Sequence, residues 1–220
     1  MKNLIILNLS LLLSQFVFSQ SDIQTLFKDD ADIGAVNLKG ALHYNNETQQ
    51  YTISGSGQNI WGTHDDFHFG WKKIHGDFIL DAQMHFLGNG TNPHRKIGWM
   101  VRKALDSNAA YVDAALHGDG LTSLQYRRTM DSGTEEIKTG ITAPDVIRLQ
   151  RKGNTYFLYA AKFSNPLIEV ARLELNIGDD VYVGLFICSH EENISESAIF
   201  SNVRITVPAK DSFVPYHLIL

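Results

Sequence analysis

Planar hydrogen-bonding side chains gather on the outward positions of several strand-like segments between residues 102 and 190. Period-two alternation places carboxylate, amide, guanidinium and imidazole groups there, together with an aromatic ring. Such groups form paired hydrogen bonds with sugar hydroxyls, and aromatic faces pack on the C–H faces of pyranose rings. The residues concerned are Arg102, Tyr111, Asp113, His117, Gln125, Arg127 and His190. The pattern suits a saccharide site; the alternative is a solvated face with incidental pairs, such as Arg102 with Asp113.

The densest group of histidines and aromatic residues lies in residues 61–71 and raises the question of a metal site. His64-Asp65-Asp66 and His68 offer imidazole and carboxylate ligands close together in the sequence. Strand alternation sends neighbouring side chains to opposite faces, so these groups rarely converge on one tetrahedral site. We therefore expect no metal and no cofactor. Phe67 and Phe69 are expected in the core, with His68 on the opposite face.

Hydrolysis of a glycosidic bond needs two carboxyl groups that flank the bond. The sequence lacks the alternating Glu-x-Asp-x-x-Glu run that jelly-roll glucanases often carry on one strand. Asp77 and Asp81 share a strand face but are expected to be solvated, and the acids of residues 191–196 are expected in a surface loop. Residues 117–120 are expected to form a hairpin turn, with calcium binding there left open, and Cys188 to be a buried thiol. Whether the protein is an enzyme stays open.

Alternation of apolar and polar residues predicts the strands that position these side chains. In residues 110–117, Val112, Ala114 and Leu116 share the core-facing side, which leaves Asp113 and His117 on the other side. Roughly ten to twelve short strands separated by turns are typical of a sandwich or barrel. Helical periodicity is limited to residues 23–29. The clearest strands are expected at Gln50–Ser54, Gly76–Phe86, Lys96–Leu105, Ala110–His117, Leu121–Arg128, Val146–Arg151, Thr155–Ala161, Asp180–Ser189 and Ala198–Val207.

The composition is that of an ordinary globular protein. Of the 220 residues, 44% are hydrophobic and the net charge is only −5, which excludes a disordered chain. With 19 basic against 24 acidic residues, a nucleic-acid partner is not expected. The single cysteine excludes an intrachain disulfide bond. The oligomeric state is not indicated.

Residues 1–19 have the pattern of a secretory signal peptide. Lys2 precedes an apolar run from Leu4 to Phe18, and Val17 and Ser19 fit the small-residue rule of the cleavage site. We expect cleavage between Ser19 and Gln20 and export to the periplasm or beyond; the alternative is an uncleaved anchor. No later stretch is apolar enough to span a membrane, and residues 20–220 are expected to form one domain.

Several segments together resemble a known family. They are Gly57–Thr63, Phe67–Phe69, Gly76–Phe78, His94–Arg102, Ala115–Arg127, Ile147–Asn154 and Val181–His190. In this order they resemble the bacterial concanavalin A-like domain family described as "regulation of enolase". Some members of this family are named biopolymer transporters, and it accompanies glycoside hydrolases and TolB-like propeller proteins. The resemblance covers residues 32–203.

The resemblance implies an all-β, concanavalin A-like jelly-roll sandwich of two curved antiparallel sheets. Its concave face, where related lectins and glucanases hold saccharide, would be lined by Arg102, Asp113, His117, Gln125 and Arg127, with Trp61 and His68 at the rim and His190 on the same side. Trp61 and Trp99 could instead be core residues. The expected function is an exported carbohydrate-binding or accessory domain with a poly- or oligosaccharide partner. The alternatives are a jelly-roll glycoside hydrolase or lyase and a protein-interaction scaffold.

The alternation in residues 110–117 leads to a specific hypothesis for His117. We expect its imidazole to lie beside Arg102 or Arg127 on the concave face and to contact the ligand there. A nearby arginine favours the neutral imidazole and Asp113 favours the imidazolium, so the sequence leaves its charge open.

Overall fold

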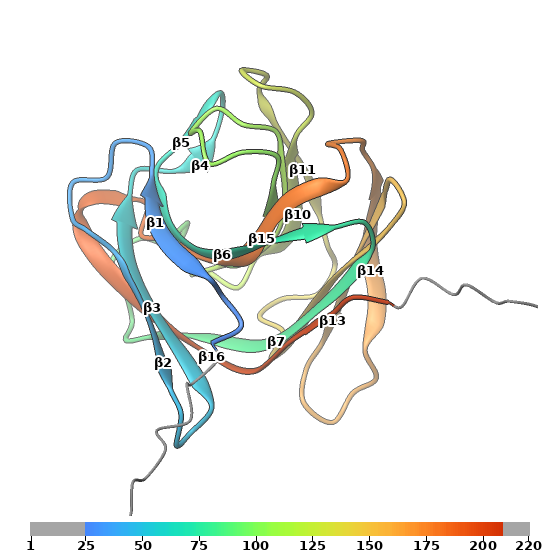
Figure 1. The fold of residues 1–220 in the computed structure, drawn as a ribbon. Helices are drawn as coiled ribbons and strands as arrows, with labels where there is room; N and C mark the ends of the chain where they lie inside the picture. The colour runs from blue at the N-terminus through green and yellow to red at the C-terminus, as the bar shows by residue number, and fades with distance from the viewer. Residues whose placement is uncertain (1–24, 209–220) are drawn as a thin grey trace, which may run out of the picture.

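The computed structural model describes residues 25–208 and contains sixteen β-strands, with no helix in that range. The expected signal peptide, its cleavage site and the last twelve residues lie outside the described residues. Two seven-stranded antiparallel sheets pack face to face, and a two-stranded hairpin lies apart from them (Figure 1). The expected all-β sandwich is therefore confirmed.

We call the first sheet, which carries most of the candidate residues, sheet A. Its strands, in spatial order, are β1 (Asp29–Ile33), β6 (Phe67–His75), β15 (Asp180–Cys188), β8 (Lys96–Arg102), β9 (Tyr111–His117), β10 (Thr122–Arg127) and β11 (Thr134–Lys138). The second, sheet B, has the order β14 (Ile168–Glu174), β13 (Thr155–Ala161), β12 (Val146–Lys152), β7 (Phe78–Leu87), β16 (Glu191–Thr206), β3 (Gln50–Gly57) and β2 (Ala41–Asn45). The hairpin consists of β4 (Ile60–Trp61) and β5 (His64–Asp65).

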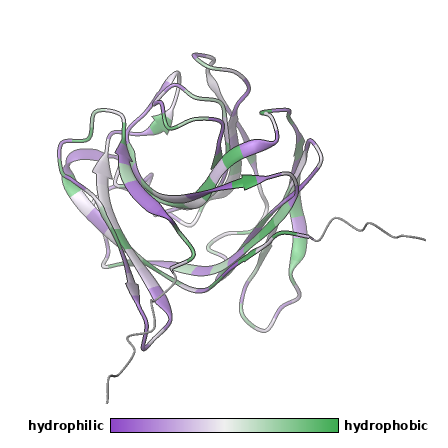
Figure 2. Ribbon diagram, in the orientation of Figure 1, coloured by the Kyte–Doolittle hydropathy of each residue, from purple (hydrophilic) through white to green (hydrophobic). Residues whose placement is uncertain are grey.

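The main core lies between the two sheets and is built by the alternation seen in the sequence. Hydrophilic and hydrophobic residues alternate along many of the strands (Figure 2). In β9, Val112, Ala114 and Leu116 enter the core as predicted, and Trp99 of β8 is fully buried beside them. The positions between them therefore belong to the opposite face of sheet A, which we call its outer face.

Strand β16 differs from the prediction, because it begins at Glu191 rather than near Ala198. The expectation that all the acids of residues 191–196 lie in a surface loop is therefore wrong. Glu196 is buried, and one of its carboxylate oxygens lies 2.6 Å from Nη1 of Arg95. A buried carboxylate needs such a partner. That partner is about a hundred residues away in the chain, so local sequence could not reveal it.

A second layer covers much of the outer face of sheet A. Phe67 and Phe69 of β6, Phe186 of β15 and Met100 of β8 form an apolar cluster there, and Ile60 of the β4–β5 hairpin packs into it. In Figure 1 the hairpin lies on the side of sheet A that faces away from sheet B. Part of the expected open concave face is therefore closed.

Three charged side chains hold this layer in place and are fully buried. The Asp65 carboxylate accepts hydrogen bonds from Nη1 and Nη2 of Arg127 at 2.8 and 2.7 Å, and from Nη1 of Arg102 at 2.7 Å. Both guanidinium groups also lie over the ring of Tyr111. Bidentate pairing of this kind is strong and directional. We call these three charged residues the Asp65 triad.

Backbone carbonyl groups complete the hydrogen bonding of the Asp65 triad. Nη2 of Arg102 donates to the carbonyl of Asp106 at 2.6 Å, and Nη2 of Arg127 donates to that of Gly62 at 3.0 Å. Arg127 also donates to Ser132. The triad thus connects the β4–β5 hairpin to the loops that follow β8 and β10. Arg102 and Arg127 occupy the predicted face, but they bind the protein itself.

Replacing Asp65 by Asn removes the charge while it keeps the shape of the side chain. Two buried guanidinium groups then lack a counter-ion, and we expect Asp65→Asn to lower the free energy of unfolding by ~3–5 kcal/mol. Urea unfolding followed by tryptophan fluorescence measures this. The control is Glu135→Gln, which breaks an exposed pair with Arg128 and should change the midpoint little. An Asp65→Asn protein as stable as this control would contradict the assigned role.

Candidate functional site

A cavity of about 250 Å³ opens on the outer face of sheet A, where the second layer ends. Strands β8 to β11 supply its floor, the β4–β5 hairpin supplies one wall, and two histidines come from the connecting segments. Its lining residues are Asn59, Trp61, His94, Lys96, His117, Leu121, Gln125, Glu136, Lys138 and His190. We call this the small cavity. Four of the eight candidate ligand residues, Trp61, His117, Gln125 and His190, meet here.

Strand register explains why these residues meet. His117 lies directly opposite Lys96 in the β8–β9 pair, and Gln125 lies opposite Glu136 in the β10–β11 pair. Directly opposite residues point to the same face of a sheet, with side chains close enough to interact. The register of these two strand pairs therefore sets the arrangement of the floor.

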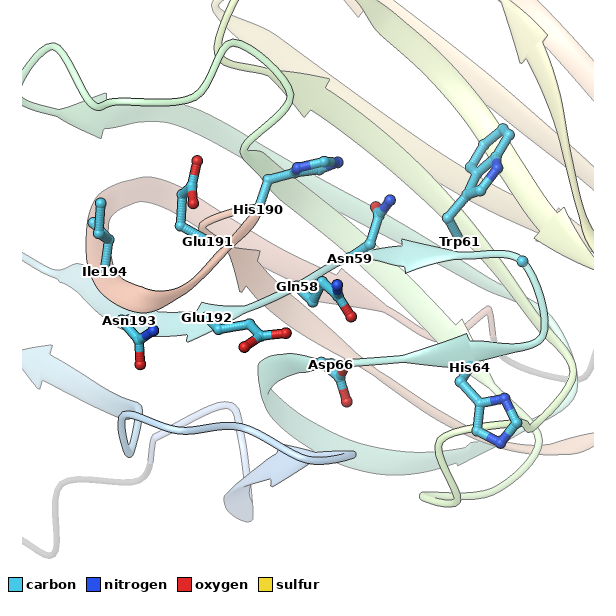
Figure 3. A pocket seen from close by; sticks show the side chains of 11 residues that line it. Gln58, Asn59, Trp61, His64, Asp66, His190, Glu191, Glu192, Asn193 and Ile194 are labelled. Atoms are coloured by element: carbon cyan, nitrogen blue, oxygen red, sulfur yellow. The ribbon is translucent and has the colours of Figure 1, made fainter.

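Trp61 stands between the small cavity and a neighbouring cavity of about 690 Å³. Figure 3 shows Asn59, Trp61 and His190 projecting to one side of the wall, while Asp66 and Glu192 project to the other. The first three residues line both cavities. Trp61 keeps 42% of its surface exposed, so it is not a core residue. A large, partly exposed aromatic side chain beside two neighbouring cavities can pack on a ligand.

The imidazole of His117 is neutral at physiological pH. Burial lowers its pKa to about 4, and the nearby positive charge of Lys96 acts in the same direction. Nε2 of Gln125 lies 3.0 Å from a carboxylate oxygen of Glu136 and 3.2 Å from Nε2 of His117. Because the carboxylate can only accept, the amide nitrogen must donate to it, and the same amide donates to the imidazole. This network assigns the ring proton of His117 to Nδ1.

The ammonium group of Lys96 is also buried, with 2% of the residue exposed. Its Nζ donates to Oδ1 of Asn59 at 2.7 Å and to the carbonyl of Ile60 at 3.0 Å. It also lies 5.6 Å from the centre of the Trp61 ring. Burial lowers the pKa of Lys96, while nearby acidic groups including Asp113 oppose that effect.

Asp113 lies in the floor but is not among the residues that line the small cavity. It is fully buried, and both its carboxyl oxygens lack a hydrogen-bond partner among the described residues. Burial raises its pKa well above the ordinary value, although the charge of Lys96 opposes this. Its role as a direct ligand contact is therefore not supported, because it has no exposed surface and lies directly opposite Met100 of the apolar cluster.

Three further candidate residues are placed elsewhere. Arg102 and Arg127 belong to the Asp65 triad and have no exposed surface. His68 faces sheet B, as its alternation with Phe67 and Phe69 predicts, but it does not form the expected rim. Its Nδ1 lies 2.7 Å from a carboxylate oxygen of Asp32 on β1. His117 is consequently on the predicted face, but beside Lys96 and Gln125 rather than beside an arginine.

Sequence reasoning missed several lining residues. Lys96 shares its face with Arg102, so the alternation could have found it. Asn59 directly precedes the short β4–β5 hairpin, and Glu136 lies on β11. Neither element was predicted from the sequence. His94 contacts the site from a loop, with ring centroids 5.6 Å from His190 and 6.4 Å from His117.

Within residues 25–208, no group of three or more histidine, cysteine or acidic side chains is arranged to hold a metal ion. Over the same range, no helix is long and apolar enough to cross a membrane. Cys188 is a buried free thiol, as expected, and burial raises its pKa to about 11. It is therefore not a reactive thiolate at neutral pH.

Solved structures share this architecture at low sequence identity. A functionally unknown protein from Saccharomyces cerevisiae matches with a TM-score of 0.60 and 13% identity, over 79% of this chain and 95% of its own. The carbohydrate-binding module CBM66 from Bacillus subtilis matches with 0.52 and 13%, over 83% and 98%. The GH43 protein BlXynB from Bacillus licheniformis matches with 0.53 and 11%, over 82% of this chain but 39% of its own. These likenesses show a jelly-roll sandwich of the concanavalin A-like type.

No family model matches the chain, and no curated protein matches it significantly. Membership of the "regulation of enolase" family therefore stays a prediction that rests on the quoted segments. The structural likenesses establish the fold, and a shared fold does not imply a shared function.

The low pKa of His117 predicts a loss of stability in acid. The unfolded chain takes up a proton near pH ~6.5, whereas the folded protein resists it down to about 4. The contribution of neutral His117 to the free energy of unfolding is therefore fully present above the pKa of the unfolded chain. It is lost as the pH falls towards the pKa of the folded protein. Its size is ~3 kcal/mol by linkage. His117→Gln removes this titration, so its free energy of unfolding should decline less than that of wild type between pH ~7 and ~4.5.

Urea unfolding at stepped pH measures the effect. His75→Gln removes an exposed histidine outside both cavities and should follow wild type. Parallel pH profiles for His117→Gln and wild type would show that His117 does not resist protonation in the folded protein.

Proposed function

We propose that the protein is an exported carbohydrate-binding or accessory domain that holds a saccharide in the small cavity. The observation that carries the proposal is the meeting of an exposed tryptophan with buried polar atoms that lack partners. Nδ1 of His117 and Oε1 of Gln125 have no hydrogen-bond partner among the described residues. Leaving such atoms unsatisfied is costly, so a site that retains them is suited to a ligand rich in hydroxyl groups.

The size and lining of the site support this proposal. A cavity of about 250 Å³ suits a single sugar ring better than a large cofactor. The neighbouring cavity shares three lining residues with it and offers room for adjoining sugar units. Trp61 supplies the apolar face on which a pyranose packs. Donors and acceptors on the other sides provide the specificity.

The small cavity supports binding more strongly than hydrolysis. A glycosidase needs two carboxyl groups, one of which is a general acid with a raised pKa. Among residues 25–208, Glu136 is the only acidic side chain that lines the small cavity. Burial acts to raise its pKa, but hydrogen bonds from Gln125 and Ser123, together with the nearby charge of Lys138, lower it overall. Glu136 is therefore an acceptor that orients Gln125 rather than a general acid.

The structural likenesses agree with this proposal at the level of the fold. CBM66 is by name a carbohydrate-binding module, and BlXynB is a GH43 protein. The proposal itself rests on the residues of the small cavity, and the export component rests on residues 1–19.

Removing the aromatic wall tests the proposal. A glycan array followed by isothermal titration calorimetry should find an oligosaccharide that binds wild type. Trp61→Ala should weaken that binding about tenfold, since the packing of an aromatic face contributes ~0.5–1.5 kcal/mol beyond its area. Phe163→Ala is the matched control, because it also truncates an exposed aromatic side chain but lies outside both cavities. Failure of every saccharide to bind would overturn the proposal.

The export component has its own test. Expression of the full chain in a secreting bacterial host should give a protein whose intact mass corresponds to a start at Gln20. Recovery of the uncleaved chain in the membrane fraction would instead support the anchor alternative.

A further inference from the structure

Lys96 is a buried cation that has no ion-pair partner in the part of the chain that the structure describes. No carboxylate lies within 4.0 Å of its Nζ among the described residues, unlike Arg95, Arg102 and Arg127, which are all paired. Its two hydrogen-bond acceptors, on Asn59 and Ile60, are neutral. An ammonium group has three hydrogens, so one donor remains free. Burying a charge in this way is unfavourable unless an anion compensates for it.

The other charged groups of the small cavity do not neutralise Lys96. Glu136 is hydrogen-bonded to Gln125 and lies 3.7 Å from Nζ of Lys138 at the exposed edge. Asp113 lies in the floor, and neither of its carboxyl oxygens has a hydrogen-bond or ion-pair partner among the described residues, Lys96 included. Burial raises its pKa, and the charge of Lys96 opposes that effect. His117 is neutral, and burial also lowers the pKa of His190. No acidic side chain among the described residues is therefore within ion-pair distance of Lys96.

A second free donor lies on the neighbouring strand. Nδ1–H of His117 has no partner among the described residues, and His117 is directly opposite Lys96 in the β8–β9 pair. One ammonium hydrogen and one imidazole hydrogen on facing residues can be accepted by the two oxygens of one carboxylate. Hydrogen bonds from a charged donor to a carboxylate are about twice as strong as neutral ones.

We infer that the saccharide held in the small cavity carries a carboxylate, as a uronic acid does, and that Lys96 and His117 bind this group while Trp61 packs on the sugar ring. The inference rests on the proposed function and names its ligand class. A neutral sugar would leave the ammonium group of Lys96 without a counter-ion. The acidic sugar supplies one and satisfies both free donors.

Comparison of acidic oligosaccharides with their methyl esters tests the inference directly. Oligomers of galacturonate, of glucuronate-bearing xylan and of alginate are each titrated into wild type as the free acid and as the ester. The ester keeps the sugar skeleton but removes the negative charge. At least one acid should bind about tenfold or more tightly than its own ester. Lys96→Met keeps the apolar stem and should abolish this preference.

A matched control and the wild-type comparison keep the test decisive. Lys73→Met removes a lysine that also lies over an aromatic ring, that of Tyr182, but outside both cavities, so it should keep the acid preference. Thermal unfolding verifies that each variant folds; if Lys96→Met does not, the acid–ester comparison on wild type still decides the ligand class. Retention of the preference in a folded Lys96→Met protein would overturn the assignment to Lys96.

The failure of this inference is distinguishable from failure of the proposed function. If acids and esters bind equally, or only neutral oligosaccharides bind, and Trp61→Ala weakens that binding, the saccharide site stands and the uronate inference is wrong. If neither acidic nor neutral saccharides bind, both are wrong.

Discussion

The buried Asp65 triad is the interaction on which the arrangement of the outer face depends. One carboxylate serves two guanidinium groups, and the remaining guanidinium hydrogens are directed at backbone carbonyls of the surrounding loops. Charges so deeply buried are tolerated only when every partner is in place. The β4–β5 hairpin is therefore held over sheet A by a requirement for charge compensation as well as by apolar packing.

This constraint divides the outer face into two parts with different properties. Towards Arg102 and Arg127 the face is covered, and its charged side chains are paired within the protein. Towards Lys96 and His117, at the opposite ends of β8 and β9, the cover ends and the small cavity opens. The same hairpin carries Trp61 at its tip, so the element that closes one part also forms a wall of the other. A single two-stranded element thus both covers the apolar part of the face and forms a wall of the small cavity.

Burial also determines the electrostatics of the open part. Histidine and lysine lie opposite each other, and burial lowers the pKa of both. A neutral imidazole beside an ammonium group gives two donors without mutual repulsion. Gln125 orients the imidazole, and Glu136 orients Gln125. The carboxylate of Glu136, which completes this chain of hydrogen bonds, acts as a structural acceptor.

The sequence by itself determined the fold class and the facing of the strands. Alternation is a local property with a period of two, so it correctly placed Val112 and Leu116 in the core and Asp113 and His117 on the outer face. It also located most of the clear strands to within a few residues. Short elements with little periodicity, among them β4, β5 and β11, were missed.

Only the tertiary structure decided which outward side chains are available to a ligand. Arg102 and His117 have equivalent positions in the alternating pattern, yet one is sealed by Asp65 and the other lines a cavity. Asp65 is 37 residues from Arg102 and 62 residues from Arg127 along the chain. No local sequence pattern encodes contacts between residues so far apart. The sequence of each strand determines the polarity of a sheet face. Which part of that face stays open depends on how distant segments of the chain pack over it.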